Sequence, residues 1–421
     1  MKYVIITYKI VEIGGAQQYC RNKGLYLERE GFDVIIFSGA QGKVYIDYLK
    51  RFANYIFKEL SFPIHCFSKN HVDEIVSKLA MIVGYHDSEV VVESNTLATA
   101  QWAELLASRL HCKHVSFNVS EIEKASSHIE ARFLKYKLDR HELFGITSES
   151  VSKMLKKYYS IPCNPSFAFY AACSNVVEDI ETNILDMLPQ ASFNIGSIGR
   201  LEKGFVLPVL LQIKAFCEAK SGDTFNIILI GGSIDKALQD NIKRIFKSVM
   251  NANLLITGFL YPIPRKLVKS IDVFVSSSGS AMASMLEGVP TISVTPDRGD
   301  PLGILDYTTR NDVFGEKSNR SLSELLELIL YSGFCQKVNR LGMLTEQQQG
   351  FDSEMRKQLS IACEGNDGNY FNVSRICSGT LKQMLYSYLC RFLGVDSLVR
   401  IQLVFSRFKQ NILWFTGAKG R

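Results

Sequence analysis

The chain has 421 residues, of which 47% are hydrophobic and 21% are charged, and its formal net charge is +6. This composition excludes an intrinsically disordered chain, because such chains lack the apolar residues needed to build a core. The length exceeds that of one typical domain and predicts about two or three. No apolar run reaches the roughly 18–20 residues that a membrane-spanning helix requires.

The cysteines and the charges point to a compartment and a partner. The ten cysteines are scattered and form no C-x-x-C pair, and residues 1–15 read as a first strand instead of a signal peptide. This favours reduced thiols in the cytoplasm over a disulfide framework or a zinc site. From Lys382 to the C-terminus, seven basic residues face one acid, Asp396, so this tail alone carries a charge of +6. The charge excess predicts a partner for the tail and argues against nucleic-acid binding by the body of the chain.

Strand and helix patterns alternate along the first half of the chain. Alternation of this kind predicts a parallel sheet with helices on both faces, whose ligands bind at the carboxyl ends of the strands. The predicted strands cover residues 2–9, 33–37, 89–93, 113–117 and 143–147. Helices are predicted between them, including residues 96–110 and roughly 122–138.

Two features at predicted strand ends are candidates for function. Gly14 and Gly15 follow the first strand and let the backbone approach a ligand closely. A dinucleotide-binding fingerprint needs three glycines, so a nicotinamide or flavin site is not indicated. Glu121 follows the strand at 113–117, where a catalytic role and a role in the first turn of a helix both remain open.

The pattern restarts after residues 161–192, where periodicity is weak and prolines cluster, so we place a domain boundary there. Each predicted strand of the second half ends in a glycine-containing turn. These strands cover residues 193–198, 225–230, 253–256 and 271–275. The sequence therefore predicts an α/β protein with two doubly wound domains that face each other across a cleft.

The predicted elements of the chain are organised around residues 271–304. This stretch predicts a strand, a Ser/Gly turn at 276–280, a small-residue helix and a second strand. A helix that starts directly after such a turn presents free N–H groups and the positive end of its dipole to an anion. An ordinary strand–helix corner remains the alternative, because the turn lacks the lysine of a phosphate-binding loop.

The C-terminal tail carries an amphipathic pattern. Apolar residues follow at spacings of three and four, as on one stripe of a helix: Leu398, Ile401, Phe405, Phe408, Ile412 and Phe415. Two interpretations stay open, a helix packed across a domain and a basic helix lying on an anionic membrane surface.

Several of these motifs occur together in a recognisable order: Gly14-Gly15, then residues 199–204 (GRLEKG), 230–232, 257–259 and 271–304. In this order they resemble the glycosyltransferases with two Rossmann-like domains, the B-type fold. Within that group the chain is similar to the retaining group 1, or family 4, enzymes, which use nucleotide-diphosphate sugars to build bacterial lipopolysaccharide and capsule. The resemblance implies an acceptor-side domain at 1–172, a nucleotide-sugar-binding domain at 173–364 and a basic helical extension at 365–421.

The resemblance also implies site residues. Arg200 and Lys203 match the two cations that hold the donor diphosphate in the family, and with Glu121 they are the catalytic candidates. The candidate donor-binding residues are Gly14, Gly15, Gly232, Gly258, Phe259, Leu260, Ser278, Gly279 and Ser280. Tyr261, next in the chain, either stacks on the nucleotide base or packs. No metal and no cofactor besides the donor is implied.

One departure from the family concerns residues 271–304. The family carries a pair of glutamates here, but Ala283 stands at the position of the second and the loop is too short for the first. We expect Asp297, Asp300 and a loop at residues 301–304 to replace contacts of these glutamates. The retaining or inverting outcome stays open.

The expected function is transfer of a hexose-type sugar from a UDP- or GDP-sugar to a glycan or lipid-linked acceptor. The protein is expected in the cytoplasm or peripherally on the inner face of the membrane. Two alternatives are a nucleotide-sugar epimerase of the same fold and a non-catalytic homologue that binds nucleotide.

Overall fold

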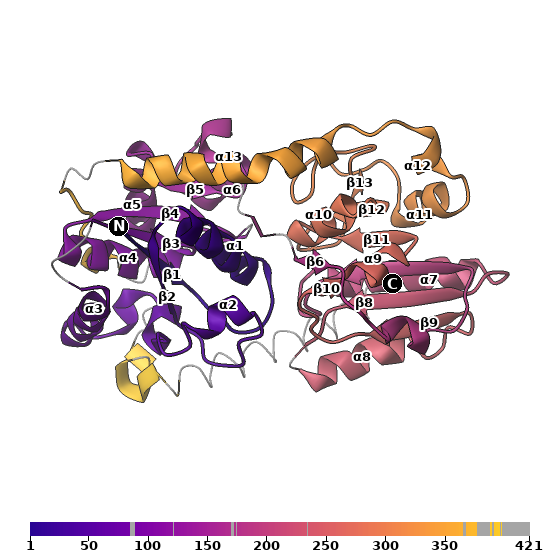
Figure 1. Ribbon diagram of the computed structural model, residues 1–421, viewed down its shortest axis with the longest axis horizontal. Helices are drawn as coiled ribbons and strands as arrows, with labels where there is room; N and C mark the ends of the chain where they lie inside the picture. The colour runs from indigo at the N-terminus through magenta and orange to yellow at the C-terminus, as the bar shows by residue number, and fades with distance from the viewer. Residues whose placement is uncertain are drawn as a thin grey trace.

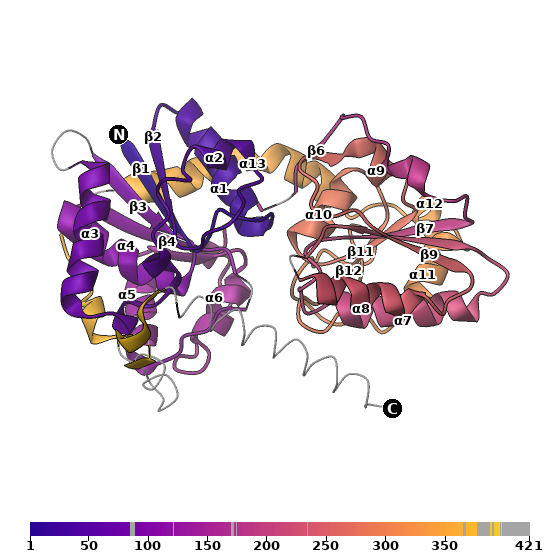
Figure 2. The same ribbon diagram turned by 90° about the horizontal axis from the view of Figure 1, so that it is seen from below.

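A computed structural model describes residues 1–84, 89–120, 122–169, 172–173, 175–233, 235–364, 368–376, 388–389, 391–395 and 397, with the backbone alone at 345–349. Within these residues two large β-sheets stand side by side, and helices cover both (Figures 1 and 2). The predicted α/β architecture with two doubly wound halves is confirmed.

The first half is a five-stranded parallel sheet in the order β2-β1-β3-β4-β5. Its strands are almost entirely buried, as expected for a parallel sheet covered on both faces. They are β1 (Lys2–Thr7), β2 (Asp33–Ser38), β3 (Val90–Ser94), β4 (Lys113–Asn118) and β5 (Leu143–Gly145). The helices are α1 (Gly15–Arg29), α2 (Asp47–Lys50), α3 (Lys69–Val83), α4 (Leu97–Leu110), α5 (His128–Asp139) and α6 (Ser148–Leu155).

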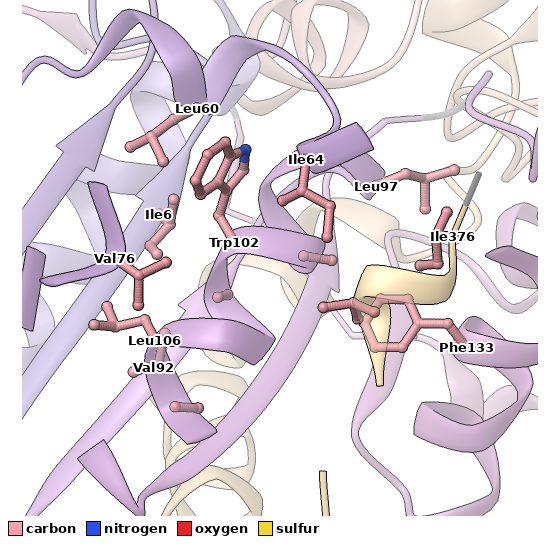
Figure 3. Close-up of a cluster of buried hydrophobic side chains, with 14 of the residues drawn as sticks. Ile6, Leu60, Ile64, Val76, Val92, Leu97, Trp102, Leu106, Phe133 and Ile376 are labelled. Carbon is pink, nitrogen blue, oxygen red and sulfur yellow. The ribbon is translucent and has the colours of Figure 1, made fainter. Parts of the chain in front are cut away.

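Side chains of β1 alternate between the two faces of this sheet, because successive residues of a strand point to opposite sides. Val4 and Ile6 join a core formed with helices α3 to α6, whereas Tyr3 and Ile5 join a core on the opposite face with α1. Figure 3 shows the first of these cores around Trp102, whose indole nitrogen donates a 2.8 Å hydrogen bond to the Phe62 carbonyl.

The second half is a six-stranded sheet in the order β13-β12-β11-β7-β8-β9, parallel except for β13. Its strands are β7 (Phe193–Ile198), β8 (Phe225–Ile230), β9 (Ala252–Ile256), β11 (Val273–Ser276), β12 (Thr291–Val294) and β13 (Pro301–Ile304). A small separate sheet pairs β6 (Val177–Glu178) with β10 (Ile263–Pro264). The helices are α7 (Val206–Ala219), α8 (Lys236–Phe246), α9 (Arg265–Lys269), α10 (Gly279–Leu286), α11 (Leu322–Leu330) and α12 (Phe334–Lys337). Short 3-10 turns lie at Lys58–Ser61, Ile64–Cys66, Pro165–Phe167, Ile184–Met187 and Val373–Arg375.

Two local expectations need correction. The helix predicted from residue 122 begins at His128, because the Ser127 side chain accepts a hydrogen bond from the Glu130 N–H and so caps the helix there. Residues 301–304 were expected to form a loop, but they form β13, which pairs antiparallel with β12 at the edge of the sheet.

Helix α13 (Met343–Cys363) runs from the second half back over the first (Figure 1). Its Met355 and Ala362 are buried in the core around α1. The Gln358 side-chain oxygen accepts a 2.9 Å hydrogen bond from Lys23, which also forms a buried 2.6 Å ion pair with Glu93. The domain boundaries after residues 172 and 364 stay predictions. Helix α13 belongs to the predicted second domain by sequence, but its side chains complete the core of the first half.

The predicted amphipathic stripe at 398–415 lies outside the described residues. Among the residues that are described, no helix is both long enough and apolar enough to cross a membrane. Because the stripe is not described, the two alternatives for the tail both stay open.

Candidate functional site

A cavity of about 270 Å³ lies between the two halves and is lined by both. Figure 2 shows α1 and α10 on the sides of the two halves that face each other. From the first half the lining includes Gly14, Gly15, Ser120 and Thr147. From the second half it includes Arg200, Lys203, Phe259, Leu260, Ser278, Gly279, Ser280 and Asp312. The site therefore lies where ligands of such sheets bind, at the carboxyl ends of the strands.

The two glycines at the start of α1, Gly14 and Gly15, stand where there is little room for a side chain. Gly14 has an extended backbone, with φ near −172°, yet a Cβ atom there would lie 2.9 Å from the Gln17 side-chain oxygen and 3.6 Å from Arg200 Nε. A Cβ atom at Gly15 would lie 3.2 Å from that of Cys173. Without these side chains the backbone and the first N–H groups of α1 are open to the cavity.

Arg200 and Lys203 lie on the short turn after β7 and both line the cavity. The Lys203 N–H donates to the Arg200 carbonyl at 3.2 Å, so the turn folds back and brings the two residues to the same side. Arg200 Nη1 lies 3.2 Å from a carboxylate oxygen of Glu12 in the first half. Arg200 Nε is buried and has no hydrogen-bond partner among the described residues.

The start of α10 forms the opposite wall. Ser278 has φ 57° and ψ −143°, a conformation that a residue with a side chain adopts only where its surroundings enforce it. Its N–H donates to the Asp312 carbonyl at 2.7 Å, which helps to hold this conformation. Gly279 and Ser280 follow as the first residues of the helix, where N–H groups have no intrahelical partner and the dipole favours an anion.

The turn after β9 brings Phe259 and Leu260 to the cavity. Gly232 and Gly258 are not among its lining residues; a Cβ atom at Gly232 would lie 3.2 Å from Gly258 Cα, so these glycines allow two turns to approach. The Phe259 ring lies 5.4 Å from that of Tyr45 in the first half. Tyr261 packs against the core of the first half.

Three further predicted site residues are not among the described residues that line the cavity, and an acidic residue that does line it was not predicted. Glu121 lies outside the described residues. Asp297 and Asp300 do not line the cavity, and Asp300 lies 2.7 Å from Lys317 Nζ, so the expectation that they face the site is not supported. Asp312 was missed, because it belongs to no motif and reaches the cavity only through the course of the chain after β13.

A further carboxyl group lies beside the carboxyl ends of β3 and β4. One oxygen of Glu123 accepts hydrogen bonds of 3.0 Å from the Leu97 N–H and from the Asn118 side chain. Burial raises the pKa of Glu123 to about 7, and the hydrogen bonds oppose this rise only in part.

Glu123 gives a pH prediction. A pKa of about 7 in the folded chain exceeds the unfolded value of about 4.3, so the folded state binds more protons between these values. The free energy of unfolding therefore falls as the pH rises through this window. We expect Glu123→Gln to remove the effect, so that the variant gains about 1–3 kcal/mol relative to wild type between about pH 5 and pH 8.

Urea denaturation at several pH values measures this gain. Glu181→Gln, at an exposed carboxylate, is the control and should follow the wild-type profile. Parallel profiles for wild type and Glu123→Gln would contradict the prediction.

No family model and no curated protein sequence matches the chain. Solved structures do. A glycosyltransferase from Rickettsia africae ESF-5 aligns with a TM-score of 0.55 and 15% identity, covering 86% of this chain and 98% of that one. HepE from Anabaena, in complex with UDP-glucose, aligns with a TM-score of 0.56 and 12% identity over 86% and 98% of the two chains.

The chain has the glycosyltransferase B-type fold. A UDP-GlcNAc 2-epimerase from Neisseria meningitidis aligns over 87% of this chain and 100% of its own, with 16% identity and a TM-score of 0.47. At these identities the likeness shows the fold alone. In the B-type fold found here, the cavity occupies the cleft between the two Rossmann-like halves.

Proposed function

We propose that the chain is a glycosyltransferase that takes a sugar from a UDP- or GDP-type nucleotide-diphosphate sugar. The observation that carries this proposal is the buried Nε of Arg200, which has no hydrogen-bond partner among the residues that the structure describes. Arg200 lies beside the open backbone of Gly14 and lines the same cavity as the start of α10. A guanidinium group and a helix N-terminus together favour a phosphate-bearing ligand. The binding of UDP-glucose by HepE supports a donor of this class.

In this proposal the diphosphate is the leaving group. Arg200 and Lys203 compensate the negative charge that grows on it as the bond to the sugar breaks, which lowers the barrier for transfer. The halves enclose the donor and exclude water that would otherwise hydrolyse it. Glu121 remains the proposed third catalytic residue, and no metal is assigned to the reaction.

For the acceptor we propose a glycan or lipid-linked glycan of bacterial surface-polysaccharide synthesis, such as lipopolysaccharide or capsule. Ser120 and Thr147 line the first-half wall of the cleft. The Thr147 hydroxyl accepts the capping hydrogen bond from the Ser150 N–H, so its own O–H stays available to donate to a sugar. We place the protein in the cytoplasm, with peripheral attachment to the inner membrane face through its tail. In the described part of the tail, Tyr388 and Phe392 are 61% and 86% exposed, which supports contact with a lipid surface.

Titration of the full chain with UDP, GDP and ADP by calorimetry tests the proposed donor class. We expect UDP or GDP to bind and ADP to bind more weakly. A subsequent assay with the matching sugar nucleotides should detect release of the nucleoside diphosphate, unchanged by a metal chelator. Absence of binding by both UDP and GDP would contradict the proposal, whereas binding without turnover, even with lipid acceptor present, would favour the non-catalytic homologue.

The tail gives a second prediction. Removal of residues 377–421 should lower binding to phosphatidylglycerol-containing vesicles at least about tenfold, since each lost basic residue contributes about 1 kcal/mol near an anionic surface. The cut is placed after Ile376 because Val373 and Ile376 are buried in the core of the first half. Nucleotide binding should be unchanged, and neutral phosphatidylcholine vesicles are the control. Equal vesicle binding by the truncated and full chains would remove the membrane assignment.

A further inference from the structure

Glu12 occupies an unusual position in the cleft. It follows β1 with φ 64°, in the left-handed region that residues with side chains rarely adopt. Its N–H donates to the Lys43 carbonyl at 3.1 Å, which ties this backbone to the neighbouring loop. One oxygen of its carboxylate lies 2.5 Å from Lys9 Nζ and 3.2 Å from Arg200 Nη1. A single oxygen thus serves one cation from each half of the molecule.

The two cations are not equivalent. Lys9 belongs to the same loop as Glu12, and its carbonyl accepts a 2.7 Å hydrogen bond from the Gln17 side chain, which fixes it to the first half. Burial lowers the pKa of Lys9, and the positive charge of Arg200 lowers it further. If Arg200 moves away, Glu12 keeps Lys9 as its partner and Lys9 loses a repulsive neighbour. The Glu12 carboxylate therefore keeps a counter-ion, Lys9. A carboxylate without a counter-ion in a partly buried site would cost stability.

Arg200 is only partly satisfied in this arrangement. Its Nη1 donates a hydrogen bond to the Glu12 carboxylate, while Nε is buried and has no hydrogen-bond partner among the described residues. A diphosphate offers several oxygens and can accept two parallel hydrogen bonds from a guanidinium group. Arg200 can therefore gain hydrogen bonds by exchanging the carboxylate for the diphosphate.

We propose that Glu12 is a positioning residue that holds Arg200 at the donor site in the empty cleft and gives it up to the donor diphosphate. This inference rests on the proposed function. Before the donor enters, the ion pair keeps the guanidinium group beside Gly14 and links the two halves. When the diphosphate binds, its oxygens replace the carboxylate, and Glu12 stays paired with Lys9. Glu12 and the donor therefore compete for the same cation.

If Glu12 and the donor diphosphate compete for Arg200, removing the charge of Glu12 should strengthen nucleotide binding. Glu12→Gln keeps the shape of the side chain but removes its charge, so UDP or GDP, whichever wild type binds, should bind about three- to tenfold more tightly. A residue that only supports the loop would give weaker binding instead. In an Arg200→Ala background, Glu12→Gln should alter the affinity for the nucleotide less than about twofold, because the guanidinium group for which Glu12 competes is absent.

Calorimetric titration of the full-length variants measures these effects. Glu30→Gln, at the opposite end of α1 from the cleft, is the matched control and should bind as wild type does. If Glu12→Gln fails to fold, judged by its thermal unfolding, Lys9→Met replaces it: Glu12 then has Arg200 as its main partner, and binding should weaken about three- to tenfold.

Unchanged or weaker binding by folded Glu12→Gln, or a gain of equal size in the Arg200→Ala background, overturns the inference. Should Lys9→Met be the variant used, unchanged or tighter binding overturns it. Failure of the wild-type chain to bind either nucleotide would instead reject the proposed function, so the two failures are distinguishable.

Discussion

Arg200→Ala is expected to reduce sugar transfer about 100-fold or more, the loss typical of removing one group that stabilises charge in the transition state. Arg200 lines the cleft and its Nε has no partner among the described residues, so a donor diphosphate is the acceptor that would complete its hydrogen bonding. Arg200→Lys should give an intermediate loss, because it keeps the charge but lacks the planar fork that binds two oxygens.

Release of nucleoside diphosphate from the donor identified by titration measures the effect. Arg298→Ala is the matched control, since Arg298 lies in the second half, is 73% exposed and is not among the residues lining the cleft. Its activity should equal that of wild type. Near-wild-type turnover by Arg200→Ala would remove Arg200 from the catalytic site.

The second large effect is expected at Lys23. Its side chain is 1% exposed, and it joins Glu93 of β3 to Gln358 of α13. Lys23→Met leaves the Glu93 carboxylate buried without its cation, although the Tyr3 and Tyr19 hydroxyls still donate to it. Removing one partner of a buried ion pair costs about 3–5 kcal/mol, so we expect a loss of that size in the free energy of unfolding.

Urea denaturation followed by circular dichroism measures this loss. Lys78→Met is the control, because Lys78 forms an exposed ion pair with Glu74 on α3 and should cost less than about 1 kcal/mol. The double variant Lys23→Met with Glu93→Gln should recover part of the loss, since no charge is then buried alone. A loss at Lys23 no larger than that at Lys78 would show that the buried pair does not stabilise the fold.

The sequence predicts those parts of the site in which a residue type suited to binding lies on a turn that directly follows a predicted strand. Gly14 and Gly15 stand between a strand and a helix, and Arg200 and Lys203 stand on the turn after another strand, so periodicity and turn residues place them at strand ends. All four line the cleft. The expectation for Asp297 and Asp300 rested on closeness along the chain, and neither residue lines the cleft; the path after β13 brings Asp312 there.

The sequence by itself determined the α/β class, the division into two sheets, and the strand ends at which the candidate residues lie, because these follow from periodicity and glycine turns within a few residues. Only the tertiary structure decided which distant groups meet. Glu12 and Arg200 pair across 188 positions and Lys23 and Gln358 across 335. Periodicity specifies which face of an element is buried, but not which other element covers that face. Those contacts depend on how whole sheets and helices pack. They bring Glu12 to Arg200 in the cleft and hold α13 against the first half.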